Sequence, residues 1–141
     1  MQIRLMQIAD YQDLFDIWSK TEGMGLRTLD DSQKGIQLFL KRNPNTCFVA
    51  QQDGQLIGGI LCGNDGRRGY IYHTAVLPSC RRQGTGKQLV NAVLKALEHE
   101  NIYKVALVVY ENNVIGNSFW ESIRFAVRKD LIYRNKSIRE Q

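Results

Sequence analysis

The sequence predicts an α/β fold with a central mixed, largely antiparallel sheet flanked by about four helices. Three observations carry this prediction. The 141 residues suffice for one domain with a buried core, and 43% hydrophobic with 23% charged residues are typical of soluble globular proteins. Strand-like and helix-like patterns follow the order β, α, α, three β, α, β, α and one or two β. No repeat or linker interrupts this order, so residues 1–141 are predicted to form a single domain.

The first part of the chain predicts one strand and two helices. Residues 3–8, IRLMQI, are apolar and β-branched like a strand. Asp10 then stands where a helix N-cap is expected. The apolar positions of that helix recur at three- and four-residue intervals, at Tyr11, Leu14, Ile17 and Trp18. Glycines within residues 22–25 end it, and Asp31 is predicted to cap a second helix that ends before Pro44.

The middle of the chain predicts three consecutive antiparallel strands. Residues 46–52 and 55–64 are strand-like and are separated by Asp53-Gly54, which is among the strongest short signals for a hairpin. A second turn over residues 64–69 leads to residues 70–76, YIYHTAV. These segments are expected to form the antiparallel part of the sheet.

The last part of the chain predicts two helices and further strands. Helical spacing of apolar residues marks a helix after a glycine-containing turn, at Leu89, Val90, Val93, Leu94 and Leu97. Residues 104–110, KVALVVY, form a continuous apolar run that is typical of a central strand covered on both faces. A further helix follows, carried by Val114, Ile115, Ser118 and Phe119. Residues 125–127 and 131–133 are expected to be strands.

Charge and cysteine usage narrow the class of protein. Nineteen Lys and Arg against fourteen Asp and Glu give a net charge of +5, which favours an anionic ligand. Three cysteines without a CxxC pair support neither a disulfide framework nor a zinc ribbon, so no metal site is predicted and a reducing compartment is expected. Asp10 and Asp13 interrupt the N-terminal stretch where a signal peptide needs apolar residues. The protein is therefore predicted to be cytoplasmic, with no membrane span.

The most informative segment is residues 81–87, RRQGTGK, between a predicted strand and a predicted helix. The first N–H groups of a helix lack intrahelical partners, and glycine lets an anion approach the backbone closely. Arg81, Arg82 and Lys87 add three positive charges. The combination predicts an anion site, although a short G-x-G alone also fits a turn that merely starts a helix. The Walker and dinucleotide-binding glycine patterns are both absent.

The RRQGTG segment resembles the Q/R-x-x-G-x-G/A signature of the GNAT superfamily of N-acetyltransferases, and the predicted order of elements is similar to the fold of that family. The resemblance covers essentially the whole chain. It implies acetyl-CoA as a co-substrate, with its pyrophosphate on the backbone amides of the turn and no metal. The coenzyme-binding residues that it implies here are Ala75, Val76, Arg81, Arg82, Gln83, Gly84, Thr85, Gly86 and Lys87.

The resemblance also implies a catalytic backbone group at Val76, near the end of a strand that is bulged and splayed in this family. Negative charge develops on the thioester oxygen as an amine attacks. A fixed N–H aimed at that oxygen stabilises the charge in a water-poor cleft. The attacking amine must be neutral, so a general base or a water chain must accept a proton.

A second segment, residues 112–125, resembles the family's helix beside the coenzyme arm. Asn113 occupies the asparagine position, and the resemblance implies that Asn113 and Trp120 bind coenzyme. Trp120 replaces a tyrosine that often serves as the general acid, and an indole N–H does not release a proton near neutral pH. The acid is therefore unassigned. Gly116 stands at an alanine position, and Arg124 replaces the usual final glycine, so a left-handed non-glycine residue is one way for this helix to end.

Two side chains are candidate general bases. His73 lies three residues before Val76, and histidine is suited to proton transfer at neutral pH. A half-buried strand histidine bonded to a neighbour is an equally good interpretation. Glu111, at the end of the expected central strand, is the second candidate, although a solvated carboxylate is the simpler reading of it.

The acceptor side is less defined. In this superfamily the segment between the first two helices shapes it, which here includes Trp18, Glu22, Met24, Leu26 and Arg27. Trp18 is expected in the core, while Glu22 and Arg27 are free to meet a charged acceptor. The basic C-terminal stretch after residue 124 fits a solvated surface, with an acidic acceptor or a partner subunit in a homodimer as alternatives.

The leading hypothesis is an acetyl-CoA-dependent N-acetyltransferase that acts by direct attack of a primary amine in a ternary complex, since no side chain stands out as a covalent nucleophile. The amine belongs to a small molecule or a peptide. The alternative is an acyl-CoA-binding regulatory or interaction module without turnover, for which Trp120 is the main argument. A nucleic-acid partner is not expected, because basic and exposed aromatic residues do not interleave.

Overall fold

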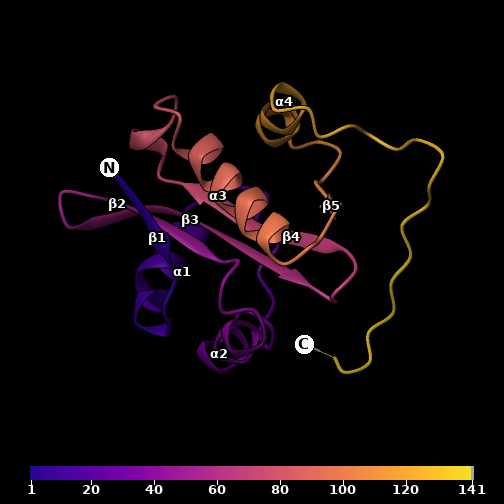
Figure 1. Cartoon of the computed structure of the whole chain (residues 1–141), viewed down its shortest axis with the longest axis horizontal. Coiled ribbons are helices and arrows are strands. Elements are labelled where there is room, and N and C mark those ends of the chain that lie inside the picture. The colour runs from indigo at the N-terminus through magenta and orange to yellow at the C-terminus, as the bar shows by residue number, and fades with distance from the viewer. Residues whose placement is uncertain (141) are drawn as a thin grey trace. The chain divides into compact units, whose positions relative to one another are not determined.

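The computed structural model describes residues 1–140, which divide into two compact units, Met1–Val108 and a second unit that begins at Val109. The first unit contains a five-stranded sheet in the order β1-β2-β3-β4-β5 (Figure 1). Its strands are β1 (Gln2–Leu5), β2 (Phe48–Gln52), β3 (Gln55–Asn64), β4 (Gly69–Val76) and β5 (Val105–Ala106). The first four strands pair antiparallel, and β5 pairs parallel to β4. The predicted mixed, largely antiparallel sheet is confirmed.

Helices cover both faces of this sheet. They are α1 (Tyr11–Ser19), α2 (Gln33–Arg42) and α3 (Thr85–His99), with short 3-10 turns η1 (Ile8–Asp10) and η2 (Pro78–Cys80). Helix α1 packs on β3 and β4 from one side, while α3 crosses the other face (Figure 1). Two glycines allow this close packing. A Cβ on Gly59 would come within 2.5 Å of Leu14 of α1, and one on Gly69 would come within 3.0 Å of Leu97 of α3.

The core on the α1 side is built from the apolar stripe that the sequence predicts. Leu14 and Trp18 are 0% and 1% exposed, and both pack in one cluster with Ile36 of α2 and Val49 of β2. Trp18 is thus a core residue, as expected. Of the predicted apolar positions of α3, Leu94 is 38% exposed, and the other four are buried: Leu89, Val90, Val93 and Leu97.

The hairpin between β2 and β3 turns at the predicted residues. Asp53 and Gly54 have φ of 52° and 76°, which is the left-handed pair that a tight hairpin turn requires. Helix α1 begins directly after Asp10, as predicted, but the Asp10 side chain makes no cap hydrogen bond to α1 and instead accepts from the Gln7 N–H at 2.9 Å.

The prediction for residues 104–110 is wrong. Only Val105–Ala106 pairs, and β5 is an edge strand of the five-stranded sheet rather than a central one. Alternate residues are open to solvent, with Val108 58% and Tyr110 55% exposed. A continuous apolar run predicts coverage of both faces only where a strand has neighbours on both sides, and β5 has one.

The second unit contains one helix, α4 (Val114–Ser122). The helix is confirmed, but the strands expected at 125–127 and 131–133 are absent from the described part of this unit. Val127, Leu131, Ile132 and Tyr133 are all more than 60% exposed. Strand-like composition does not produce a strand without a hydrogen-bonded neighbour, and this segment has no ladder.

Among residues 1–140, no helix has both the length and the apolar content that are needed to cross a lipid bilayer.

Candidate functional site

A turn with an open backbone joins β4 to α3. Gly84 lies in the left-handed region with φ of 79° and precedes the first residue of α3, and Arg82 has φ of 65°. The first helical hydrogen bond runs from Gln88 N to Gly84 O at 3.0 Å, so the N–H groups just before Gln88 have no intrahelical acceptor. A Cβ built on Gly84 would meet nothing within 4 Å. The turn therefore leaves space against a row of N–H donors.

Positive charge surrounds this turn. Arg81, Arg82 and Lys87 are exposed, and Arg81 also donates from Nε to the carbonyl oxygen of Val76 at 3.3 Å. Thr85 differs from its neighbours, because the residue is 2% exposed and its hydroxyl contacts the Met1 sulfur at 3.3 Å. The Thr85 side chain is therefore not open to a ligand. The geometry fits an anion held by N–H groups and flanking cations.

The N–H of Val76 points away from β3. Leu77 N donates to Ile57 O at 2.8 Å, and N–H groups alternate in direction along an antiparallel strand. The N–H of Val76 therefore faces the β5 side of β4. There β5 pairs only with Gly69 and Tyr70, so pairing has ended well before Val76. A backbone donor at the end of β4 is thus left without a neighbouring strand in residues 1–140.

A bulge in β4 sets the direction of His73. The β3–β4 register shifts between Ile60 and Cys62, so that β4 carries one extra residue opposite Leu61. The Tyr72 ring packs on Phe39 of α2 at 5.5 Å, and the His73 ring packs on Trp18 of α1 at 4.9 Å. Simple alternation would put these two neighbours on opposite faces. The bulge brings both to the face that α1 and α2 cover.

His73 forms a short contact with Asp31. His73 Nε2 lies 2.6 Å from Asp31 Oδ1, and the two side chains are 14% and 7% exposed. The sequence assigns Asp31 to the N-cap of the second helix, and that prediction is wrong. Ser32 caps α2 instead, with its Oγ accepting from Gly35 N at 3.0 Å. Asp31 is thereby turned inward toward β4.

Other bonds hold Asp31 in place. Its Oδ2 accepts from the Arg27 N–H at 2.6 Å, and its carbonyl oxygen accepts from the Tyr11 hydroxyl at 2.6 Å. Burial and the Asp31 charge raise the pKa of Tyr11, so this hydroxyl is a neutral donor at neutral pH. Sequence reasoning missed Asp31 as a site residue. The only signal was a second capping residue, Ser32, directly after it.

A pocket of about 310 Å³ opens beside Asp31 in the first unit. Helix α1 and the segment that follows it form its wall, which consists of Tyr11, Phe15, Leu26, Arg27, Thr28, Asp31 and Ser32. Of the residues expected at an acceptor side, Leu26 and Arg27 line this pocket, whereas Glu22 and Met24 do not. Tyr11, Phe15 and Leu26 give the pocket an apolar part, and Asp31 and Arg27 are its charged residues.

The remaining candidates lie in the second unit. Asn113 is the N-cap of α4, and its Oδ1 accepts from Gly116 N at 2.9 Å. A Cβ on Gly116 would come within 2.6 Å of the Asn113 side chain, so glycine at that position accommodates the cap. Trp120 is half-buried against Phe119 and Phe125. Glu111 is exposed in the turn before α4, not at the end of a strand as expected.

Helix α4 ends on a left-handed arginine, which is one of the ends that its sequence permits. Arg124 has φ of 69°. Its N–H donates to Glu121 O at 3.0 Å, and Phe125 N donates to Trp120 O at 2.9 Å. These two bonds form a Schellman motif, and the Trp120 and Phe125 rings, 4.9 Å apart, provide the apolar contact that accompanies it.

The chain is similar in sequence to known acetyltransferases. The acetyltransferase (GNAT) family model matches residues 11–125. An acetyltransferase of Sodalis glossinidius is 26% identical over 140 residues, which cover 99% of this chain and 97% of the relative.

Two solved structures share the fold. The PaiA N-acetyltransferase of Thermoplasma acidophilum, in complex with coenzyme A, superposes with a TM-score of 0.78 at 20% identity and covers 90% of each chain. The aminoglycoside N-acetyltransferase AAC(6')-Iy, in complex with a bisubstrate analogue, superposes with a TM-score of 0.74 at 20% identity, covering 96% of this chain and 97% of that one.

Proposed function

The chain belongs to the acetyltransferase (GNAT) family, and from that premise we propose that it transfers an acetyl group from acetyl-CoA to a primary amine by direct attack in a ternary complex. The observation that carries the proposal is the free N–H of Val76, which lies where β4 has lost its neighbouring strand, five residues before the cationic turn. One strand end thus presents a donor for a carbonyl oxygen close in sequence to a site for phosphates.

The turn is the proposed pyrophosphate site. The N–H groups of residues 83–87 and the charges of Arg81, Arg82 and Lys87 would hold the coenzyme phosphates, and the absence of a Cβ on Gly84 leaves room for their approach. The PaiA neighbour was solved with coenzyme A bound, which supports a coenzyme of this class. Val76 would contact the pantetheine arm, and Ala75 would do so through its backbone alone, because it is 3% exposed and packs in the core cluster. Asn113 and Trp120 are proposed to contact the coenzyme as well, as the family resemblance implies.

The proposed chemistry uses Val76 and His73. As the amine nitrogen bonds to the acetyl carbon, the Val76 N–H stabilises the negative charge that develops on the thioester oxygen. The carbon–sulfur bond breaks, and the coenzyme leaves as a thiolate that takes a proton from water. His73 accepts the proton that the amine nitrogen must lose. Glu111 stays a second candidate for this last role.

The proposed acceptor is the amine of a small molecule or a peptide. The AAC(6')-Iy neighbour is named an aminoglycoside N-acetyltransferase, and aminoglycosides are small amines. The pocket beside Asp31 supports an acceptor with an apolar part, because Tyr11, Phe15 and Leu26 form much of its wall.

A second candidate function rests on Trp120. An acyl-CoA-binding module without turnover would keep the coenzyme turn and need no acid for the departing thiolate, and Trp120 cannot supply that proton. A thiolate is protonated readily by water, since a free thiol titrates at about pH 8.5. The indole therefore does not oppose turnover, and the acetyltransferase is the better-supported function.

One experiment separates these functions. Purified protein is incubated with acetyl-CoA and a panel of polyamines, aralkylamines, aminoglycosides and peptides with free N-termini, and free thiol and acetylated product are measured together. Acetylated amine formed in equal amount to free thiol supports the proposal. Tight binding of acetyl-CoA with no product from any amine would favour the binding module.

A further inference from the structure

We propose that Asp31 is a positioning residue which fixes the imidazole of His73 with its Nδ1 lone pair toward the acceptor amine, so that the two residues form a carboxylate–histidine general base. The inference rests on the proposed acetyl transfer and goes beyond it, because nothing in the sequence connects Asp31 with His73. The two residues are 42 positions apart in the chain and meet only in the fold.

The contact with Asp31 determines the tautomer of His73. A carboxylate has only acceptor oxygens, so the 2.6 Å contact requires that His73 Nε2 carries a hydrogen and donates it to Asp31 Oδ1. In the neutral imidazole the lone pair then resides on Nδ1. Asp31 itself cannot turn away, since its Oδ2 is engaged by the Arg27 N–H at 2.6 Å.

The Nδ1 atom of His73 is open to solvent. It has no hydrogen-bond partner within residues 1–140, and it is not fully buried. It is therefore reached from solvent, although the side chain as a whole is only 14% exposed. The Trp18 ring, at 4.9 Å, closes one side of the imidazole. The His73 ring is thus packed on one side and accessible at Nδ1, the nitrogen that carries the lone pair.

The titratable and charged groups near the His73–Asp31 pair bear on its protonation. Tyr11 and Arg27 line the pocket beside Asp31, and Tyr11 is a neutral donor to the Asp31 carbonyl. Arg27 contributes its backbone N–H. When Nδ1 accepts the amine proton, the imidazolium that forms faces the Asp31 carboxylate, which stabilises it. The proton then passes from Nδ1 to solvent, and the neutral tautomer returns.

The test is Asp31→Asn. The Arg27 N–H needs an oxygen, so the amide oxygen of the variant must face Arg27 and its NH₂ group must face His73 Nε2. Nε2 then has to accept a hydrogen bond, and the imidazole hydrogen moves to Nδ1. We expect turnover to fall about 100-fold, which is the scale of general-base catalysis, with acetyl-CoA affinity unchanged. Asp30→Asn makes the same chemical change on the exposed neighbour and is expected to leave turnover unchanged.

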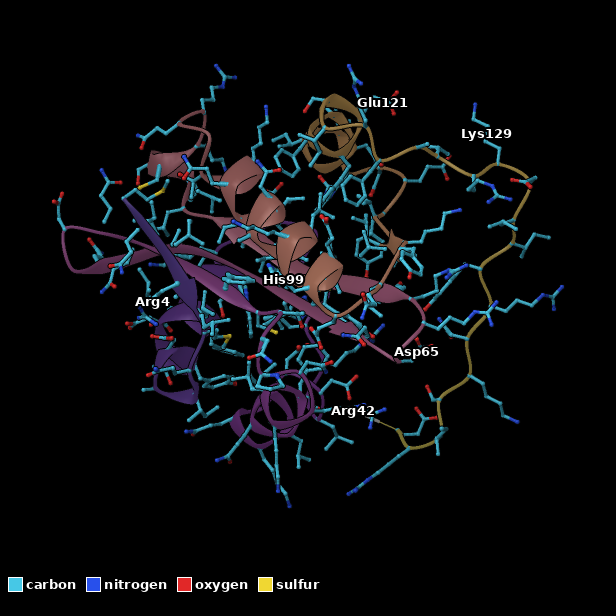
Figure 2. All side chains as sticks on the ribbon, in the orientation of Figure 1. Arg4, Arg42, Asp65, His99, Glu121 and Lys129 are labelled. Carbon is cyan, nitrogen blue, oxygen red and sulfur yellow. The ribbon has the colours of Figure 1, made fainter. Side chains whose placement is uncertain are left out.

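Nitrogen-15 NMR of the histidine side chains gives a readout that does not depend on activity. The chain has two histidines, and His99 is exposed at the end of α3, where it serves as an internal reference (Figure 2). We expect the Nε2–H form of His73 in the wild type and the Nδ1–H form in Asp31→Asn. An Nδ1–H form in the wild type would overturn the proposal without any kinetic measurement.

A double-mutant comparison covers the case in which Asp31→Asn loses stability. If Asp31 acts through His73, the Asp31→Asn change should lower turnover in the wild type but have no further effect in a His73→Gln background. Equal losses in both backgrounds would show that Asp31 is merely structural. Unchanged turnover in Asp31→Asn, in an otherwise active protein, overturns the dyad alone. A wild-type chain that acetylates no amine overturns the proposed function, and the dyad falls with it.

Discussion

Arg4 holds Asp10 through two parallel hydrogen bonds at the start of α1. Arg4 Nη1 lies 2.9 Å from Asp10 Oδ2, and Arg4 Nη2 lies 2.8 Å from Asp10 Oδ1. Asp10 is 8% exposed and also accepts from the Gln7 N–H. Arg4 lies on β1 (Figure 2). The pair thus ties the first strand to the helix that carries Trp18, on which the His73 ring packs.

This ion pair predicts a loss of stability in acid. Burial alone would raise the pKa of Asp10, but the Arg4 guanidinium and the Gln7 N–H outweigh it and hold that pKa below its ordinary value. The ion pair therefore contributes fully to the free energy of unfolding above pH ~4, the pKa of an Asp in the unfolded chain. This contribution is lost as the pH falls through the lower pKa of Asp10 in the folded protein. We expect Asp10→Asn to cost about 2 kcal/mol of unfolding free energy at pH 7 and less at pH 3, measured by urea unfolding.

The chain offers a matched control for Asp10→Asn. Arg128 and Asp130 form the same two-bonded pair at 2.8 Å, with both side chains exposed. Asp130→Asn should leave the unfolding free energy unchanged, because solvent screens an exposed pair. Equal effects of the two substitutions would contradict a special role for the Asp10 pair.

Gly84→Val tests the phosphate turn. The side chain would stand in the space where an anion approaches, and the left-handed backbone with φ of 79° opposes any Cβ by about 1 kcal/mol or more. Gly54→Val in the β2–β3 hairpin is the control, since Gly54 has φ of 76° and equally open surroundings. Both variants should lose similar stability. Only Gly84→Val should weaken the binding of acetyl-CoA, by about tenfold, or about 1.4 kcal/mol, as measured by calorimetry. An unchanged affinity would refute the placement of the phosphates at this turn.

Local signals made most of the first unit predictable. The Asp53-Gly54 turn fixes the β2–β3 hairpin by backbone conformation alone, and the apolar stripe of α1 predicts which face is buried. The cationic glycine turn before α3 was also readable, because its donors and charges belong to one short segment.

Tertiary relationships could not be read in the same way. Asp31 and Ser32 are both good capping residues, and only the fold shows that Ser32 caps α2 while Asp31 turns toward His73. The family resemblance implies a bulge in β4, but nothing in residues 70–76 shows at which residue it lies. Residues 104–110 are apolar enough for a central strand, but whether a strand has one neighbour or two depends on the rest of the sheet.

Thiol reactivity offers a test of which cysteines are buried. Burial raises the pKa of Cys47 to about 11 and that of Cys62 to about 12, so neither forms an appreciable thiolate at pH 7.5. Cys80 is partly exposed on η2. We expect one thiol to react rapidly with a disulfide reagent in the folded protein and all three in denaturant.

The control for this labelling is Cys80→Ser, which should remove the rapid phase entirely. Because Cys80 directly precedes the proposed coenzyme turn, saturating acetyl-CoA, which carries no free thiol, should slow its labelling in the wild type. A second rapid thiol in the folded state would be inconsistent with the buried positions of Cys47 and Cys62.

The end of α4 predicts a stabilising substitution. Arg124 occupies the left-handed position of the Schellman motif, where its Cβ crowds the following carbonyl and glycine does not. Arg124→Gly relieves this cost, partly offset by the greater freedom of glycine in the unfolded chain, and should raise the unfolding free energy by about 1 kcal/mol. Arg124→Ala keeps the Cβ and removes the charge, so it should bring no gain. If both substitutions stabilise equally in thermal and urea unfolding, relief of charge repulsion rather than of backbone strain is the cause.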